Sequence, residues 1–297
     1  MDGIIVIDKP KGCTSHDIVY MVKKLTGEKV GHTGTLDPNA TGVLPLLIGK
    51  GTLASKYLIN HDKTYQVVLK LGEKTDTADV EGSIVETKEI DKLLIEEENV
   101  NNILNSFKGN QEQIPPMYSA IKVNGKKLYE YARKGEKVNL SPRKIKIYNI
   151  KLIELNKESD EIFFEVSCSK GTYIRSLCED IAKKLNTVGY MKELRRIQVG
   201  NFYIENATEI EDFKKNIDNK EYLDKYFISI EKLFDKAREI TLKRKELKLF
   251  LNGVKLKFKL ENGIYRIYNE IGDFIGIGTI ENNNLKRDII LKNIENH

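Results

Sequence analysis

The stretch GHTGTLDPNATG, residues 31–42, holds three glycines, one carboxylate and one histidine, and almost nothing that a core could bury. Glycine lets a backbone approach a ligand closely, so the lone Asp37 would be presented to whatever lies beside this loop. The alternative is a structural turn in which Asp37-Pro38 caps the chain reversal and the side chains of His32 and Thr33 bond the backbone. The segments around the loop bear on that choice.

The flanking sequence predicts strands and helices without a strict βαβ rhythm. Residues 3–8, GIIVID, indicate a strand, and Ser15 is a suitable N-cap for a helix that ends at Gly27. A strand is expected at 64–72, and an amphipathic helix at 91–107. Further on we expect paired strands within 141–171, a helix at 173–185 and a strand from 194. The pattern predicts an α+β fold with a mixed sheet.

Two domains are expected from the length of 297 residues and from a change of pattern near residue 228. Beyond that point one helix at 241–253 is followed by short strands around turn sequences, which indicates a small β-rich domain. We therefore predict domains at 1–228 and 229–297. Residues 113–138 are interrupted by Pro115, Pro116, Gly125 and Gly135, and we interpret them as a long functional excursion.

Composition limits the classes of partner and compartment. The net charge of +5 is unevenly distributed, with nine Lys/Arg in residues 119–148 and seven in residues 241–260. These runs are either solvated faces or surfaces for a polyanion such as nucleic acid. Three cysteines and four histidines form no metal-binding spacing, and residues 1–12 resemble neither a signal peptide nor a membrane span. We expect a cytoplasmic protein without a metal and without a membrane segment.

Two other residue types could work with Asp37. Arg175, just inside a predicted helix, is the side chain suited to hold a carboxylate ionised, and Tyr65 at the start of a strand could pack in the core or stack on a flat ligand. A phosphate-binding P-loop is excluded because Gly49-Lys50 is followed by Gly51 and lacks the first glycine.

Five blocks together resemble the bacterial tRNA pseudouridine-55 synthase family of the TruB type. They occur in the family's order across residues 1–203. In this sequence they read KPKGCTSHDIV, GHTGTLDPNATG, KTYQVVLKLGEKTDTADVEG, GTYIRSL and LRRIQVGNF. The last seventy residues resemble the small RNA-binding PUA-type domain that follows in this family. The resemblance implies the pseudouridine synthase fold, a mixed and mainly antiparallel sheet with flanking helices, plus a PUA-like domain.

The resemblance also implies roles for individual residues. It makes Asp37 the catalytic aspartate, Tyr65 the aromatic residue against the target base and Arg175 the partner of the aspartate. His32 matches a histidine that takes the place of the extruded base, and Asp79 matches a carboxylate that contacts a flipped nucleotide. The remaining candidates for substrate binding are Tyr173 and Leu194 at the pocket and Lys126, Lys127 and Arg133 in the excursion. Plain core packing is the alternative for Leu194.

The implied reaction is the isomerisation of uridine 55 in the T-loop of tRNA. It breaks the bond from C1′ to N1, turns the uracil and joins C1′ to C5, so no cofactor is needed. An ionised aspartate could act as a nucleophile or as a base at C2′, and Tyr65 could also be the base that removes the C5 proton. The uridine must leave its stack, which costs a few kcal/mol that binding elsewhere offsets.

The implied partner is the T-arm of tRNA, bound by a monomer. One alternative is a non-catalytic RNA-binding or RNA-folding module of the same fold, which would not need an aspartate beside RNA. Another is a related synthase that acts on a different RNA under the direction of a guide.

Overall fold

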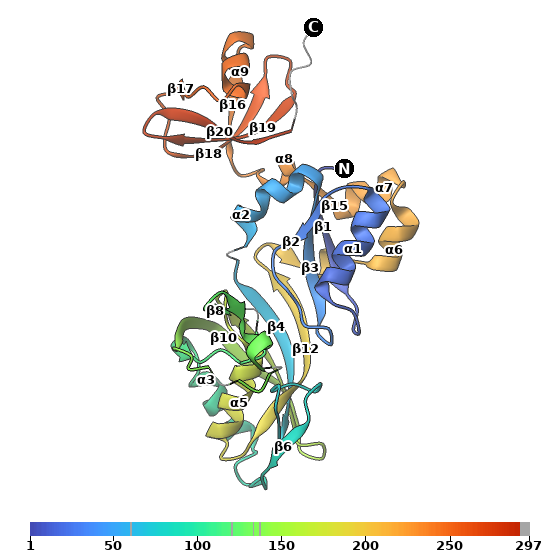
Figure 1. Cartoon of the computed structure of the whole chain (residues 1–297), viewed down its shortest axis with the longest axis vertical. Coiled ribbons are helices and arrows are strands. Elements are labelled where there is room, and N and C mark those ends of the chain that lie inside the picture. Colours follow the sequence, from blue (N-terminus) through green and yellow to red (C-terminus); the bar gives the residue numbers. More distant parts are fainter. Residues whose placement is uncertain (60, 120, 133, 137, 292–297) are drawn as a thin grey trace.

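The computed structural model describes residues 1–59, 61–119, 121–132, 134–136 and 138–291. Its largest element is an eleven-stranded sheet in the elongated lower part of the molecule (Figure 1). The strands of this sheet are β1 (Gly3–Lys9), β2 (Val30–His32), β3 (Thr41–Ile48), β4 (Lys63–Leu71), β7 (Gly109–Gln113), β10 (Arg143–Asn156), β11 (Glu161–Cys168), β12 (Gly189–Val199), β13 (Phe202–Tyr203), β14 (Thr208–Glu209) and β15 (Phe227–Ser229).

The main sheet runs in the order β14-β1-β3-β12-β4-β11-β10-β7, with β13, β15 and β2 paired beside this path. Its pairs are antiparallel except β1 with β14 and β12 with β3. The parallel contact of β12 with β3 involves only Arg195 with Thr41 and Arg196 with Gly42. The prediction of a mixed, mainly antiparallel sheet in an α+β fold is confirmed.

Helices cover one face of each half of the main sheet. α3 (Glu97–Asn105) and α5 (Ile174–Lys184) enclose an apolar core with β4, β10 and β11. α1 (Ser15–Thr26) and α6 (Ile210–Asn216) enclose a second core with β1 and β3. α7 (Lys220–Tyr226) follows α6, and a 3₁₀ turn, η2 (Ile204–Asn206), lies between β13 and β14. The buried apolar residues of α1, α3, α5 and α6 face the sheet.

The start of α1 differs from the prediction. Thr14, not Ser15, is the N-cap, because the Thr14 hydroxyl accepts from the backbone N–H of Asp17 and the Asp17 carboxylate accepts from the backbone N–H of Thr14. Ser15 is buried, and its hydroxyl bonds both backbone groups of Leu36. The predicted end is confirmed, since Gly27 has φ of 69° and closes the helix.

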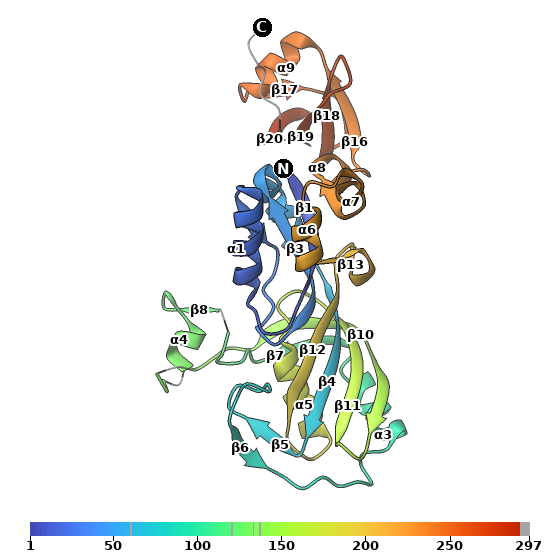
Figure 2. The same cartoon turned by 90° about the vertical axis from the view of Figure 1, so that its right-hand side faces the viewer.

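Two further segments are inserted around the main sheet. β5 (Glu73–Thr75) and β6 (Ile84–Thr87) form a hairpin beside its lower end. The excursion contains the strands β8 (Lys122–Val123) and β9 (Lys126–Lys127) and the short helix α4 (Leu128–Ala132). Figure 2 shows β8 and α4 standing away from the main sheet, at one side of the molecule.

A five-stranded sheet forms the other end of the molecule, in the order β16-β18-β19-β20-β17. Its elements are β16 (Arg238–Leu242), α9 (Arg244–Leu251), β17 (Leu256–Lys257), β18 (Gly263–Asn269), β19 (Phe274–Glu281) and β20 (Asn284–Ile290). The chain reaches it through β15, which pairs with β1, and α8 (Ile230–Leu233).

The C-terminal sheet packs on the segment that precedes β4. This segment consists of a 3₁₀ helix, η1 (Gly49–Ala54), and α2 (Ser55–Leu58). Ala54 and Tyr57 contribute to one apolar cluster with Ile277 and Ile289 of the C-terminal sheet. Across the described residues, no helix is long and apolar enough to cross a membrane.

Candidate active site

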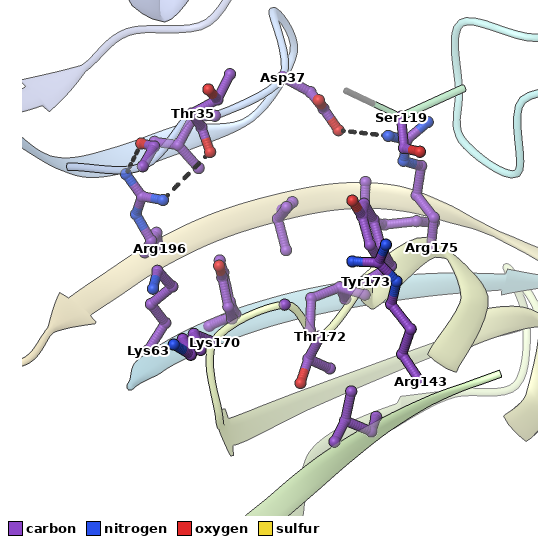
Figure 3. A pocket seen from close by; sticks show the side chains of 18 of the residues that line it. Thr35, Asp37, Lys63, Ser119, Arg143, Lys170, Thr172, Tyr173, Arg175 and Arg196 are labelled. Carbon is purple, nitrogen blue, oxygen red and sulfur yellow. Dashed lines mark hydrogen bonds and ion pairs between the residues drawn. The ribbon is translucent and has the colours of Figure 1, made fainter. Parts of the chain in front are cut away.

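A cavity of about 790 Å³ opens where the 33–37 loop meets β4, the start of α5 and the excursion (Figure 3). Six cationic side chains line it, and Asp37 is the one carboxylate among the described residues that do so. The cations are Lys63, Arg143, Lys144, Lys170, Arg175 and Arg196. The sequence predicted only Arg175 among them. This excess of positive charge suits an anionic ligand of nucleotide size.

Buried polar side chains from outside the loop fix the backbone that carries Asp37. Besides Ser15, the fully buried Lys9 directs its ammonium to the carbonyls of Pro10 at 2.9 Å, Cys13 at 2.7 Å and Pro38 at 3.1 Å. Burial lowers the pKa of Lys9. These polar contacts hold the loop together with Leu36 and Ala40, which are buried in the main core.

One glycine of the quoted stretch is required by close packing. Gly42 has φ of 104°, and a Cβ atom there would lie 2.1 Å from the backbone oxygen of Arg196. No other residue type fits this contact, because both the backbone conformation and the space exclude a side chain. Gly42 thus permits the short parallel contact of β3 with β12.

Arg175 lies between two carboxylates. One nitrogen of its guanidinium is 3.3 Å from Asp37 and the other is 3.3 Å from Asp79. The same group donates to the carbonyl of Tyr118 at 2.9 Å and to that of Thr77 at 3.4 Å. Arg175 therefore contacts three segments: the 31–42 loop, the 75–82 segment and the excursion.

The two carboxylates differ in exposure. The Asp37 side chain is 41% exposed, whereas that of Asp79 is 11% exposed. Asp79 also accepts from the hydroxyl of Thr77 at 2.6 Å and from the backbone N–H of Glu81 at 3.1 Å. It does not line the main cavity. Asp79 is held behind the guanidinium, and Asp37 is the carboxylate that a ligand can reach.

Tyr65 lies on the floor of the cavity and is paired with Arg196. It is 8% exposed, and its hydroxyl lies within the electrostatic influence of the Arg196 guanidinium. Burial raises the pKa of Tyr65 to about 12, although the positive charge of Arg196 opposes that shift. The phenol is therefore protonated at neutral pH in the free protein.

Arg196 was not among the sequence-predicted site residues, and it is 1% exposed. Its guanidinium donates to the carbonyls of Val43 at 2.8 Å, Gly34 at 3.0 Å and Thr35 at 3.4 Å. Figure 3 shows it beneath the loop, at the opposite end of the cavity from Arg175. The signal in the sequence is alternation, because Arg196 is two residues from Leu194 in one strand and so faces the same side.

Leu194 and Tyr173 both line the cavity. Leu194 also packs against the apolar core, so it has both the pocket position and the core packing that were considered for it. Tyr173 is the residue before α5, and the buried Gln113 amide bonds its backbone N–H at 2.8 Å and its carbonyl at 3.0 Å. Gln113 thereby fixes the turn that aims Arg175 at the loop.

Four other candidates lie outside this cavity or outside the described structure. His32 is in β2, where its Nδ1 accepts from the backbone N–H of Gly34 at 3.2 Å, and burial lowers its pKa. Lys126 and Lys127 form β9, with the Lys127 ammonium 5.4 Å from the centre of the Tyr129 ring. Arg133 lies outside the described residues.

Two buried hydroxyls in the cavity wall were missed by the sequence analysis. Thr33 is 3% exposed and Ser119 is 5% exposed, and both line the cavity. Neither side-chain oxygen has a hydrogen-bond partner among the described residues. No residue pattern distinguishes such hydroxyls from ordinary loop positions, so only the structure reveals them.

Comparison with known families covers most of the chain. Residues 22–174 match the N-terminal domain of TruB family pseudouridylate synthases. Residues 175–235 match the C-terminal domain of tRNA pseudouridylate synthase B, and residues 239–286 match the C-terminal region of pseudouridine synthase II TruB.

Individual proteins give the same result. A tRNA pseudouridine synthase B of Clostridium perfringens strain SM101 is 46% identical over 98% of this chain and 99% of its own length. One from Caldanaerobacter subterraneus subsp. tengcongensis is 41% identical over 96% of this chain and 98% of its own. A solved structure of a Cbf5-Nop10-Gar1 complex matches with a TM-score of 0.67 and 26% identity, over 93% of this chain and 78% of that one.

Proposed function

The chain belongs to the TruB family of pseudouridylate synthases, which are isomerases, and from that premise we propose its substrate and the roles of its residues. The substrate is the T-arm of tRNA, and the reaction converts uridine 55 in the T-loop to pseudouridine. The observation that carries this proposal is an accessible Asp37 held 3.3 Å from Arg175 in a cavity rich in positive charge.

Asp37 is the reactive group. It is the carboxylate exposed to the cavity, and Arg175 forms an ion pair with it. As a nucleophile it would form a bond to the sugar or the base, and as a base it would take the proton from C2′. Attack at C1′ and proton removal at C2′ both place the ribose of the target nucleotide against Asp37.

Arg175 acts as the partner of Asp37, and Asp79 orients Arg175. Because Asp79 is mostly buried and occupied by Arg175, Thr77 and Glu81, it fixes the guanidinium from behind. This role in the free protein differs from the nucleotide contact that the family resemblance implied. The two agree if a bound nucleotide draws one oxygen of Asp79 away from the guanidinium.

Tyr65 supports the uracil ring from below. Its side chain lines the cavity together with Arg196. To remove the C5 proton it would first have to ionise, and burial opposes that. We therefore assign Tyr65 to stacking and to retention of the detached uracil, with Leu194 and Tyr173 as the walls of the same pocket.

Binding energy for base extrusion comes from outside the pocket. Lys126, Lys127 and Arg133 in the excursion contact phosphates, as do the basic residues near α9, and His32 fills the space that the extruded base leaves. The main sheet with its helices is the catalytic domain, at residues 1–228, and the remainder is the RNA-binding domain. The protein acts as a cytoplasmic monomer without metal or cofactor.

The test is to incubate the protein with an unmodified tRNA transcript and to map pseudouridine at single-nucleotide resolution. Stoichiometric pseudouridine at position 55, formed without added metal or cofactor, is the expected result. Binding of the transcript without any pseudouridine would instead support a non-catalytic RNA-folding module. Pseudouridine at another position, or only with a guide RNA, would replace the proposed substrate.

A further inference from the structure

Ser119 carries a hydroxyl that the fold itself does not use. Its side chain is buried in the cavity wall, and the described residues provide no partner for its oxygen. Its backbone is fixed, since its N–H donates to the carbonyl of Met117 at 3.0 Å and its carbonyl accepts from Tyr129 at 3.1 Å. A buried hydroxyl without a partner is costly, so one held in place at a ligand cavity points to a contact with the ligand.

The position of Ser119 identifies which part of the ligand it meets. The carbonyl of the preceding residue, Tyr118, accepts from Nη2 of Arg175 at 2.9 Å, and that same nitrogen lies 3.3 Å from Asp37. Figure 3 shows Ser119 beside the guanidinium of Arg175, with Asp37 facing it. Ser119 therefore belongs to the Asp37 end of the cavity and not to the end at Arg196 and Tyr65.

We propose that the Ser119 hydroxyl hydrogen-bonds the ribose 2′-hydroxyl of the target nucleotide. This inference rests on the proposed function, in which C1′ or C2′ of that ribose lies against Asp37. A 2′-hydroxyl both donates and accepts, as does a serine hydroxyl, so the two groups can satisfy each other. The contact would allow the excursion to distinguish ribose from deoxyribose at the reacting nucleotide, since the 2′-hydroxyl is what separates RNA from DNA there.

The test compares two T-arm RNAs that differ only in uridine or 2′-deoxyuridine at the target position. Their dissociation constants are measured in an Asp37→Asn background, which prevents turnover, with and without Ser119→Ala. Ser119→Ala should weaken binding of the uridine RNA about five- to tenfold and that of the deoxyuridine RNA less than twofold. Ser141→Ala, at an exposed serine after the excursion, should affect neither RNA.

Equal losses on both RNAs, or no loss on either, would overturn the proposal. The melting temperature of the free protein gives a second check, because Ser119→Ala removes no hydrogen bond that the described structure contains and should not lower it. A clear fall would show that the hydroxyl supports the fold instead. Failure of the proposed function would be seen separately, as a wild-type protein that makes no pseudouridine at this uridine.

Discussion

The two ends of the cavity use arginine in opposite ways. At one end Arg175 faces the carboxylates of Asp37 and Asp79 at 3.3 Å, so it matches charge with charge beside an accessible reactive group. At the other end Arg196 is fully buried and donates to the carbonyls of Gly34 and Val43. It thus supplies these backbone oxygens with hydrogen-bond donors. The first arrangement, which we call the charged end, serves the chemistry. The second, the carbonyl end, holds the loop in which that chemistry takes place.

Burial alone therefore does not mark a catalytic cation. A buried guanidinium among carbonyls is a structural element that borders the site, while one among carboxylates binds and orients a reactive group. The same substitution at the two positions should therefore give different signatures. Activity, thermal stability and RNA affinity can each be followed independently.

The largest effect is expected from Asp37→Asn, which removes the reactive carboxylate from the charged end. The single-turnover rate of pseudouridine formation should fall by about 10³-fold or more, because the amide is neither a nucleophile nor a base. Affinity for tRNA should stay within about threefold, since phosphate contacts dominate it. Substantial turnover by this variant would show that Asp37 is not the reactive group.

Arg175→Lys keeps the charge at the same end but loses the planar fork that reaches both carboxylates. We expect the single-turnover rate to fall by about 10²-fold, with tRNA affinity and melting temperature changed much less. Both quantities should be measured on the same preparation. An unchanged rate would mean that Arg175 is not the functional partner of Asp37.

Arg196→Lys is the matched substitution at the carbonyl end. A lysine at this position lacks the separate Nε, Nη1 and Nη2 donors that reach Val43, Thr35 and Gly34, so buried oxygens of the loop lose their donors. We expect about 2–3 kcal/mol less stability. This corresponds to a fall in melting temperature of at least about 4 °C, with an activity loss of about tenfold. A stable variant with a large loss of rate alone would make Arg196 a second catalytic cation and would abolish the contrast.

The pH dependence of stability reports on the carbonyl end without changing the charged end. In the unfolded chain Tyr65 ionises near its usual pKa of 10, whereas burial raises the pKa to about 12 in the folded protein. The neutral phenol thus stabilises the fold fully below pH 10, and this contribution is lost as the pH rises from 10 to 12. Between pH 10 and pH 12 the free energy of unfolding of the wild type should therefore fall by about 2 kcal/mol more than that of Tyr65→Phe, which has no phenol to ionise. Denaturant unfolding measures this difference.

The smallest effect on chemistry is expected outside both ends. Replacing Lys126 and Lys127 by alanine, or Lys243, Arg244 and Lys245, should weaken tRNA binding and lower the slope of log affinity against log salt by about one unit per lost phosphate contact. The single-turnover rate at saturating enzyme should be retained. If neither set changes the slope, these basic runs are solvated faces.

Sequence reasoning located the charged end better than the carbonyl end. Asp37 stands out because a carboxylate among glycines would be presented to whatever lies beside the loop, with a turn cap as the structural alternative, and Arg175 was selected as a suitable partner. The link from Arg175 to Asp79 was not predicted, because nothing in the 75–82 segment indicates that it lies behind the guanidinium, and only the tertiary fold brings the two together. Arg196 was missed although its alternation with Leu194 places both on one face of a strand, because the carbonyls that its guanidinium binds lie in segments distant in sequence.

The pattern of apolar segments predicted the fold class correctly, and the errors of that prediction were confined to the ends of elements. Ser15 was assigned as a helix cap because serine is favoured there, but Thr14 takes that position and leaves Ser15 to bond Leu36. Propensity ranks Ser above Thr at such a site, whereas here tertiary contact with the loop decides. Only packing between distant segments could supply that information.

The long separation between Arg196 and the loop that it anchors also has a consequence for synthesis. Gly34 and Arg196 are 162 positions apart in the chain, and translation adds about 5–20 residues per second. After the loop has been synthesised, on the order of 10–30 s therefore pass before Arg196 is added to the chain. Until then a nascent chain has Asp37 but no site, so the protein cannot begin to modify RNA while only its first half has been made.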